Sequence, residues 1–502
     1  MTFPLDVLYM QSVASSGPKR ESLHAARALM RYNRHATGNV HRGYKVATHR
    51  VPYAEVKHLV RYRLVRLSCW LGLLGGALLV GLHALAVPTT AESKPNVLLA
   101  AFDEVLQRVV SLRQLQPKMA IKRAVRNRQQ IRTALLTLVQ DELSPAEWEA
   151  ERKALVQWGL LAPDFRLKEF VLDLLTEQAA GYYDPKQQTF FIADWLPELV
   201  QKPVMAHELV HALQDQHYDL QRNFDLVKDQ ADLTLARKAL IEGDAVAVMF
   251  AYLLEPLGLT MTDLPDMQTL LQASGALLGD QFHVYTHAPL ILRQQLLFPY
   301  VHGLAFVKAA LARSGWEGLH QVYQHPPVST AQIMHPEQYF AEPSVLPSEV
   351  TLRIPEDAFS TPWKKLKRDV LGEFFLSVIL QQFLPEDEAR QSAAGWRGDR
   401  YELFEQPGSG RLLLVGVTVW DTPEEAAEFF QSYKKLLALK YPGWVIRPLE
   451  TQTGHIWQQD QSHLMLRQQE RFVQIVEGAL TEYLPRLQAL LEQVTAVPAP
   501  PR

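Results

Sequence analysis

Two apolar helical runs and a short hairpin occupy the middle of the chain. From Leu199 to Leu213, apolar residues cover most of a helix circumference, which is typical of a helix buried at the centre of a domain. A second apolar run with helical periodicity extends from about Asp229 to Leu254. Residues 181–192 hold two aromatic-rich runs on either side of an Asp184-Pro185 turn, and they predict a β-hairpin just ahead of the first helix.

The pattern changes on either side of this central region. Residues from about Glu92 to Ala162 are helical by pattern and carry Arg-, Lys- and Gln-rich faces, which suit helices that cover the central ones. The short turn-rich run from Gly395 to Asp399 is interpreted as a tight turn. Beyond about Pro347 the sequence predicts strands at Arg411–Trp420, Trp444–Arg447, His455–Gln458, His463–Gln468 and Phe472–Glu477, a helix from the Thr422-Pro423-Glu424-Glu425 cap through Leu439, and a terminal helix from Leu480.

These patterns together predict an α+β protein. We expect a mainly helical domain at 92–345, followed by a smaller antiparallel α+β domain at 347–495. The Trp residues of the second domain, at 396, 420, 444 and 457, are expected in its core because they fall at strand positions.

An uncharged apolar run near the N-terminus predicts export. The run from Leu67 to Val87 is long enough to span a bilayer, and Arg61, Arg63 and Arg66 precede it. Ala84-Leu85-Ala86 offers a signal-peptidase site, so residues 67–88 are interpreted as a signal peptide or a transmembrane anchor. The basic extension at 1–66 is either a cytoplasmic tail or lies upstream of the true start. In both cases the bulk of the chain is expected outside the cytoplasm, anchored to the membrane or secreted.

Charge is distributed unevenly along the 502 residues. The first 66 residues hold 12 Lys and Arg against 3 Asp and Glu, or +9, which leaves −12 of the total net charge of −3 for the rest. An acidic bulk of this size argues against nucleic acid as a partner. Cys69 is the one cysteine in the sequence, so the exported region is expected to fold without a disulfide.

The first central helix contains the sequence His207-Glu208-Leu209-Val210-His211. Residues four apart lie on one helix face, so His207 and His211 can direct two imidazoles at one metal ion. Glu208 lies beside that face, where its carboxylate can take a proton from a zinc-bound water and pass it to a leaving amine. The spacing therefore predicts a Zn²⁺ site with Glu208 as the general base.

A catalytic zinc usually has a third protein ligand, and the sequence offers two. Glu242 is an acid among apolar residues on the second central helix, where a solvated face does not explain it. His217 has the metzincin spacing, but Gln214 stands where that pattern needs a Gly for a sharp turn. If the helix continues to Tyr218, His217 points away from His211. We therefore favour Glu242, with His217 as the alternative.

The stretch from His207 to Leu220, followed by Ala239–Ala245, resembles poorly characterised bacterial zincin-like metallopeptidases of the gluzincin type, and the resemblance covers about residues 165–345. It implies His207, His211 and Glu242 as zinc ligands and Glu208 as the base. The thermolysin-type pattern has an Asp four residues after the third ligand that supports a ligand His, whereas this chain has Val246. Asp215, Asp219 and Asp244 are the candidates for that supporting role.

Hydrolysis also needs a substrate-binding strand and a donor for the oxyanion. In zincins an edge strand ahead of the metal helix pairs with extended substrate, and Thr189–Ala193 is the candidate here. His335 is the first candidate for the oxyanion donor and so for a catalytic role. The other candidate donors are Tyr300, His302 and Tyr339.

Three hypotheses about function follow from these residues. The first is an exported or membrane-anchored zinc metallopeptidase that acts on a peptide or protein substrate. The second is a catalytically inactive zincin-fold module that binds metal or a partner in the cell envelope. The third is a structural helix with no metal at all.

Overall fold

The computed structural model describes residues 95–498, except residues 197, 225–226, 262, 264–281, 356–357 and 450–452. All of them belong to one compact unit. The predicted basic extension at 1–66 and the predicted signal peptide or anchor at 67–88 lie outside the described residues.

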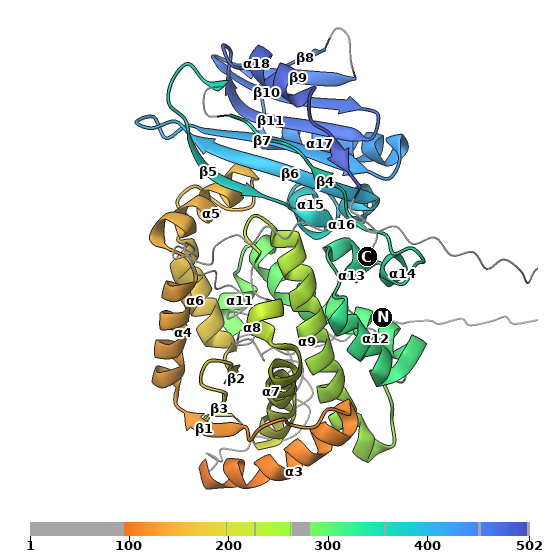
Figure 1. Cartoon of the computed structure of the whole chain (residues 1–502). Coiled ribbons are helices and arrows are strands. Elements are labelled where there is room, and N and C mark those ends of the chain that lie inside the picture. Colours follow the sequence, from red (N-terminus) through yellow and green to blue (C-terminus); the bar gives the residue numbers. More distant parts are fainter. Residues whose placement is uncertain are drawn as a thin grey trace, which may run out of the picture. The chain divides into compact units, whose positions relative to one another are not determined.

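The first part of the described chain is mainly helical (Figure 1). Its elements are α3 (Pro95–Arg113), β1 (Lys122–Arg126), α4 (Arg128–Glu142), α5 (Pro145–Gln157), α6 (Leu167–Gln178), β2 (Gly181–Asp184), β3 (Thr189–Ala193), α7 (Glu198–Tyr218), α8 (Leu220–Asn223), α9 (Ala231–Leu254), a 3₁₀ turn (Glu255–Leu257), α11 (His283–Thr286), α12 (Leu290–Gln324), α13 (Thr330–Met334) and α14 (Pro336–Tyr339). The two predicted central helices are α7 and α9, and the predicted hairpin is β2–β3, so these predictions are confirmed.

The second part of the chain is built on an antiparallel sheet. Its elements are β4 (Glu349–Val350), β5 (Lys364–Asp369), α15 (Gly372–Gln381), α16 (Glu386–Ala393), β6 (Trp396–Glu405), β7 (Leu412–Trp420), α17 (Pro423–Lys440), β8 (Val445–Pro448), β9 (Gly454–Gln459), β10 (Ser462–Gln469), β11 (Phe472–Leu480), α18 (Leu484–Leu491) and β12 (Ala496–Val497). Seven strands form one sheet in the order β5-β6-β7-β11-β10-β9-β8, and β4 pairs with β12. The α+β class is therefore as predicted.

Most predictions for the second part are confirmed. Thr422 caps α17 in a full capping box, and Trp396, Trp420 and Trp457 are buried, whereas Trp444, also predicted in the core, is only half-buried. The predicted turn at Gly395–Asp399 is instead the start of β6. Gly395 does adopt a left-handed conformation with φ 80°, but the chain enters the sheet at the next residue, and a register shift follows. The residues predicted as a turn therefore form the first, bulged part of a strand.

The three-stranded sheet of the first part corrects the predicted substrate strand. Its order is β1-β3-β2, with β1 parallel and β2 antiparallel to β3. Thr189–Ala193 is therefore the middle strand, and both of its edges are already paired, so the edge-strand role predicted for it is wrong. The sequence did not reveal β1 because Lys122–Arg126 contains three basic residues and shows no apolar alternation.

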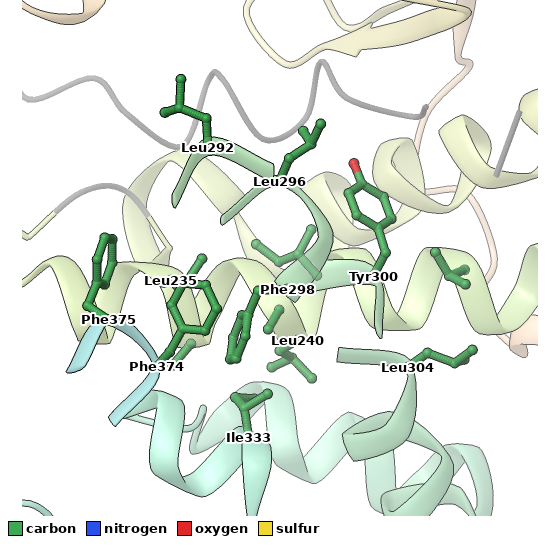
Figure 2. Close-up of a cluster of buried hydrophobic side chains, with 14 of the residues drawn as sticks. Leu235, Leu240, Leu292, Leu296, Phe298, Tyr300, Leu304, Ile333, Phe374 and Phe375 are labelled. Atoms are coloured by element: carbon green, nitrogen blue, oxygen red, sulfur yellow. The ribbon is translucent and has the colours of Figure 1, made fainter. Parts of the chain in front are cut away.

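Helices α9 and α12 pack with their backbones in contact. A Cβ added to Gly243 would lie 2.2 Å from the carbonyl carbon and oxygen of Gly303, and one added to Gly303 would lie 2.1 Å from the carbonyl oxygen of Ala239. The absence of side chains at this crossing is what allows the close approach. Next to it, Phe298 of α12 packs on Phe374 of α15, and Tyr300 points away from that cluster (Figure 2).

Within the described residues, α12 is the helix that is long and apolar enough to cross a membrane. Half of its most apolar window is buried inside the protein, as expected of a core helix. Its composition is therefore weak evidence for a membrane span.

Carboxylates from the sheet part hold two helix starts. Asp399 of β6 accepts hydrogen bonds from the backbone N–H groups of Leu371 and Gly372 at the start of α15, both at 2.8 Å. Asp369, at the end of β5, accepts from the backbone N–H of Ala231, the first residue of α9, at 2.8 Å. The residue before α9, Gln230, makes no side-chain cap, so Asp369 satisfies a donor that would otherwise lack an intrahelical partner.

Candidate metal centre

Helix α7 holds the two histidines and the glutamate of the central motif in the protein interior. The side chains of His207, Glu208 and His211 are each at most 1 % exposed. The Nε2 atoms of His207 and His211 lie 3.1 Å apart, with the two rings edge to face at 4.7 Å and 88°. Because α7 is continuous through this turn, both imidazoles project from one face.

Helix α9 brings Glu242 to the same point. Its Oε2 atom lies 3.3 Å from His207 Nε2 and 3.4 Å from His211 Nε2, and the side chain is fully buried. The three potential ligand atoms lie within 4.8 Å of one another. Two nitrogens and one carboxylate oxygen at this separation match the ligand types of a three-residue zinc site.

His217 lies outside this group. Helix α7 continues to Tyr218, and His217 Nε2 lies 2.7 Å from the carbonyl oxygen of Gln116. Since a carbonyl oxygen accepts, His217 is the donor. Of the two alternatives for a third ligand, the structure therefore brings Glu242, and not His217, to the two histidines.

The site contains buried polar atoms that the protein leaves without a hydrogen bond of good geometry. They are His207 Nδ1 and all four carboxylate oxygens of Glu208 and Glu242. Buried groups of this kind cost free energy unless a partner satisfies them. A cation between His207, His211 and Glu242 would supply a partner for the Glu242 carboxylate, so these three residues fit a zinc ion.

Electrostatics in this site also favour a bound cation. Burial would lower the pKa of His211, but the Glu242 carboxylate raises it to about 9. Burial would raise the pKa of Glu242, but His211 and His207 lower it to about 2. Without a metal, one imidazolium therefore supplies the positive charge that Glu242 requires.

Glu208 has a different environment from Glu242. Burial raises the pKa of Glu208 to about 8, opposed by His211 and by a backbone interaction with Tyr183 of β2. This interaction places the end of β2 beside the Glu208 carboxylate. A carboxyl group with so high a pKa has the basicity that a general base needs near neutral pH.

One of the four candidate oxyanion donors lies at the cluster. The Tyr300 ring of α12 stacks on the His207 ring, with centroids 6.4 Å apart and 24° between the planes. His335 is bonded elsewhere, with its Nε2 2.7 Å from Glu373 Oε1 of α15. His302 stacks on Phe298, and Tyr339 donates to the carbonyl oxygen of His325. Of the four candidates, the geometry therefore favours Tyr300 over His335 as the oxyanion donor.

The predicted supporting carboxylates do not contact a ligand histidine directly. Asp215 accepts from the Tyr183 hydroxyl at 3.2 Å, and Asp219 caps α8. The partner of His211 is instead Gln214, whose Oε1 lies 2.8 Å from His211 Nδ1, and Asp244 bonds to Gln214 in turn. Sequence reasoning missed Gln214, although its position three residues after His211 put it on the same helix face.

Comparison with known proteins adds little to this site. A family model described as a domain of unknown function (DUF8575) matches residues 361–488, which are in the sheet part of the chain. No curated protein matches the chain. A solved structure of a candidate hydrolase with a novel fold from Chloroflexus aurantiacus is 16% identical, over 54% of this chain and 96% of that one, with a TM-score of 0.32. So low a TM-score does not establish a common fold, and no function follows from it.

Proposed function

We propose that this protein is a zinc-dependent hydrolase of peptide bonds with a zincin-like catalytic domain. The observation that carries the proposal is the meeting of His207, His211 and Glu242, from two helices, beside a buried Glu208. These are the residues that the resemblance to gluzincin-type metallopeptidases assigns as ligands and base. A peptide or protein is the substrate class that this chemistry serves.

In this proposal His207, His211 and Glu242 hold the ion and Glu208 moves the proton. Bound zinc would supply a Lewis acid that acidifies a water and polarises the scissile carbonyl. Glu208 accepts a proton from the attacking water and returns it to the leaving amine. Tyr300 takes the oxyanion-donor role in place of His335, because it is the one of the four candidate donors whose ring stacks on a ligand histidine.

One observation favours the alternative, a metal-binding module without catalysis. None of the four site side chains is more than 1 % exposed, whereas a peptide must reach both the metal and Glu208. In a hydrolase, side chains that cover the site must move when substrate binds. In a structural module, they need not move at all.

Glu208→Gln separates the two functions. This substitution removes the proton acceptor and keeps the size of the side chain. Glu208 is not one of the proposed ligands, so the substitution leaves the metal-binding residues intact. We expect zinc content to be unchanged and hydrolysis of an unfolded protein such as casein to fall by about 10²–10⁴-fold, the usual contribution of a general base. Tyr300→Phe should lower kcat with the zinc retained. A zinc-loaded parent that cleaves no faster than Glu208→Gln would favour the non-catalytic module.

We also propose that the protein acts outside the cytoplasm, held by or released from the run Leu67–Val87. This part of the proposal rests on the sequence alone. Fractionation of cells that express the full chain tests it, because an exported protein is degraded by protease added to intact spheroplasts. A full chain protected until the cells are lysed would contradict export.

A further inference from the structure

We propose that Gln214 is a positioning residue that fixes the ring tautomer of His211 through a buried link to Asp244 and Arg113. This inference rests on the proposed zinc site. Gln214 is a neutral amide in the place where a carboxylate often holds a ligand histidine.

The two ring nitrogens of His211 face different partners. Nε2 points into the cluster, 3.1 Å from His207 Nε2 and 3.4 Å from Glu242 Oε2. Nδ1 points the other way, 2.8 Å from Gln214 Oε1. A histidine binds metal through a nitrogen without hydrogen, so zinc binding through Nε2 requires the hydrogen on Nδ1.

The surroundings of Gln214 determine which end of its amide faces His211. The Nε2 atom lies 3.0 Å from the Ile241 carbonyl oxygen, 3.0 Å from Asp244 Oδ2 and 2.8 Å from the Tyr323 hydroxyl. Carbonyl and carboxylate oxygens only accept, so this end must be the NH₂ group. The other end is then the carbonyl oxygen, which can only accept from His211 Nδ1. The network therefore sets the tautomer that zinc needs.

Asp244 keeps the amide in this orientation. Its Oδ2 accepts from Gln214 and from the Tyr323 hydroxyl at 2.9 Å, and its Oδ1 accepts from Arg113 Nε at 2.7 Å. Gln214, Asp244 and Arg113 are all at most 1 % exposed. Rotation of the amide would leave several buried groups without partners, which is costly in the interior. Four helices, α3, α7, α9 and α12, thereby contribute to the orientation of one imidazole.

A neutral amide also suits the charge balance of the site. Glu208 and Glu242 already place two carboxylates beside the proposed ion, which carries two positive charges. The charge of Asp244 is matched by Arg113. A carboxylate at position 214 would add an unmatched negative charge to a buried site, whereas the amide orients His211 without one.

The test compares zinc affinity and the His211 ring spectrum in matched variants of the full chain. Gln214→Met keeps the side-chain length but replaces the amide oxygen that accepts from Nδ1 with a thioether, which is only a weak acceptor. Gln201→Met is the control, because Gln201 is a buried amide on the same helix that donates to the Leu196 carbonyl oxygen. We expect Gln214→Met to weaken zinc binding by about 10–100-fold in competition with a chelator, and Gln201→Met to leave it unchanged.

Nuclear magnetic resonance of the ring nitrogens provides a readout that packing damage alone does not move. The parent should show a slowly exchanging proton on His211 Nδ1, and Gln214→Met should lose that protection. The double variant Gln214→Glu with Asp244→Asn exchanges the amide and the carboxylate at constant net charge. The carboxylate at position 214 can still accept from His211 Nδ1, and the amide at position 244 can donate to that carboxylate. The double variant should therefore recover affinity relative to Gln214→Glu alone, and it serves as the second variant if Gln214→Met does not fold.

The outcomes separate the two proposals. If the parent binds zinc and Gln214→Met binds it equally tightly with the Nδ1 proton still protected, the role of Gln214 is wrong while the zinc site stands. If the double variant binds no better than Gln214→Glu, the link to Asp244 is wrong. If the parent takes up no zinc, the proposed function fails, and the positioning role fails with it.

Discussion

Arg113 lies almost fully inside the protein, and its guanidinium meets the Asp244 carboxylate at 2.7 Å. Burial would lower the pKa of Arg113, but Asp244, Tyr323 and Tyr218 raise it, so the side chain stays charged. The guanidinium also lies over the Trp316 ring at 5.0 Å. The Arg113 guanidinium and the Asp244 carboxylate each stabilise the charge of the other, because neither has access to water.

Arg113→Leu should therefore destabilise the protein strongly. The substitution leaves a buried carboxylate without its cation, which costs about 3–5 kcal/mol in comparable pairs. Arg132→Leu is the control, because Arg132 pairs with Asp173 at the surface and such pairs contribute at most about 1 kcal/mol. Urea unfolding of metal-free protein measures both. Equal effects of the two substitutions would show that Asp244 does not depend on Arg113.

The sequence predicted those site residues whose relation is local. His207, Glu208 and His211 were found because helical spacing alone places them together. Glu242 was found because a carboxylate within an apolar, buried helix requires a partner. Arg113 could not be found this way, since only tertiary packing brings α3 to α9. Tyr300 was one of four candidate donors in the sequence, and its place beside His207 depends on how α12 crosses α9, which only the structure shows.

Among the elements, α9 and α12 cross with no room for a side chain at either Gly243 or Gly303. Gly243 lies next to Glu242 in the sequence, and Gly303 is three residues after Tyr300, so this crossing sets the positions of a proposed ligand and a proposed donor. A change that separates the two helices would move both. Side chains larger than hydrogen do not fit at either glycine without such a movement.

Gly243→Ala should lower both stability and zinc affinity. Its Cβ would lie 2.2 Å from Gly303 backbone atoms, which cannot rotate away, and overpacking of this kind typically costs about 1–3 kcal/mol or more. Gly416→Ala in β7 is the control, because its Cβ would meet neighbours only at 3.6 Å and beyond. Thermal unfolding and chelator competition measure the two effects. A Gly243→Ala protein as stable as the control would contradict the close crossing.

Elements with a strong local signal were predicted best. The capping box at Thr422 and the alternating strands after it appear in the structure close to their predicted bounds. The strands β1 and β5 were missed because their basic residues hide any apolar alternation. The order β1-β3-β2 could not be predicted, since the residues of β1 pair with residues of β3 that lie 67 positions later in the sequence.

At the scale of the whole unit, buried acids connect the helical part to the sheet part. Asp232 at the start of α9 accepts from the backbone N–H of Thr330 at 2.9 Å and also from its hydroxyl. Its Oδ1 atom would lie 1.8 Å from a Cβ on Gly372, the first residue of α15, so α15 approaches it closely. Asp369 and Asp399 hold the starts of α9 and α15 nearby. The sheet part thereby supports the helix that carries Glu242.

This junction predicts a pH dependence of stability. Burial raises the pKa of Asp232 from 3.8 to about 8, opposed by the Thr330 hydrogen bonds and reinforced by Asp399 and Glu373. Between these pH values the native state keeps a proton that the unfolded chain has lost. The contribution of Asp232 to stability is therefore complete below about pH 4 and is lost as the pH rises to 8.

Asp232→Asn removes this titration while keeping an acceptor for Thr330. Relative to the parent, the variant should gain stability as the pH rises from 4 to 8, measured by urea unfolding with a chelator present. The exposed Asp164→Asn should change stability little at either pH. A difference between Asp232→Asn and the parent that stays constant across this range would contradict a protonated Asp232.

Elemental analysis of the purified full chain is the decisive test of a zinc site made by His207, His211 and Glu242. We predict about one zinc per chain in the parent, loss of it in His207→Ala and Glu242→Ala, and retention in His217→Ala, because His217 bonds to Gln116 outside the cluster. No zinc in the parent after zinc is supplied during folding, or zinc retained in Glu242→Ala, would contradict the account.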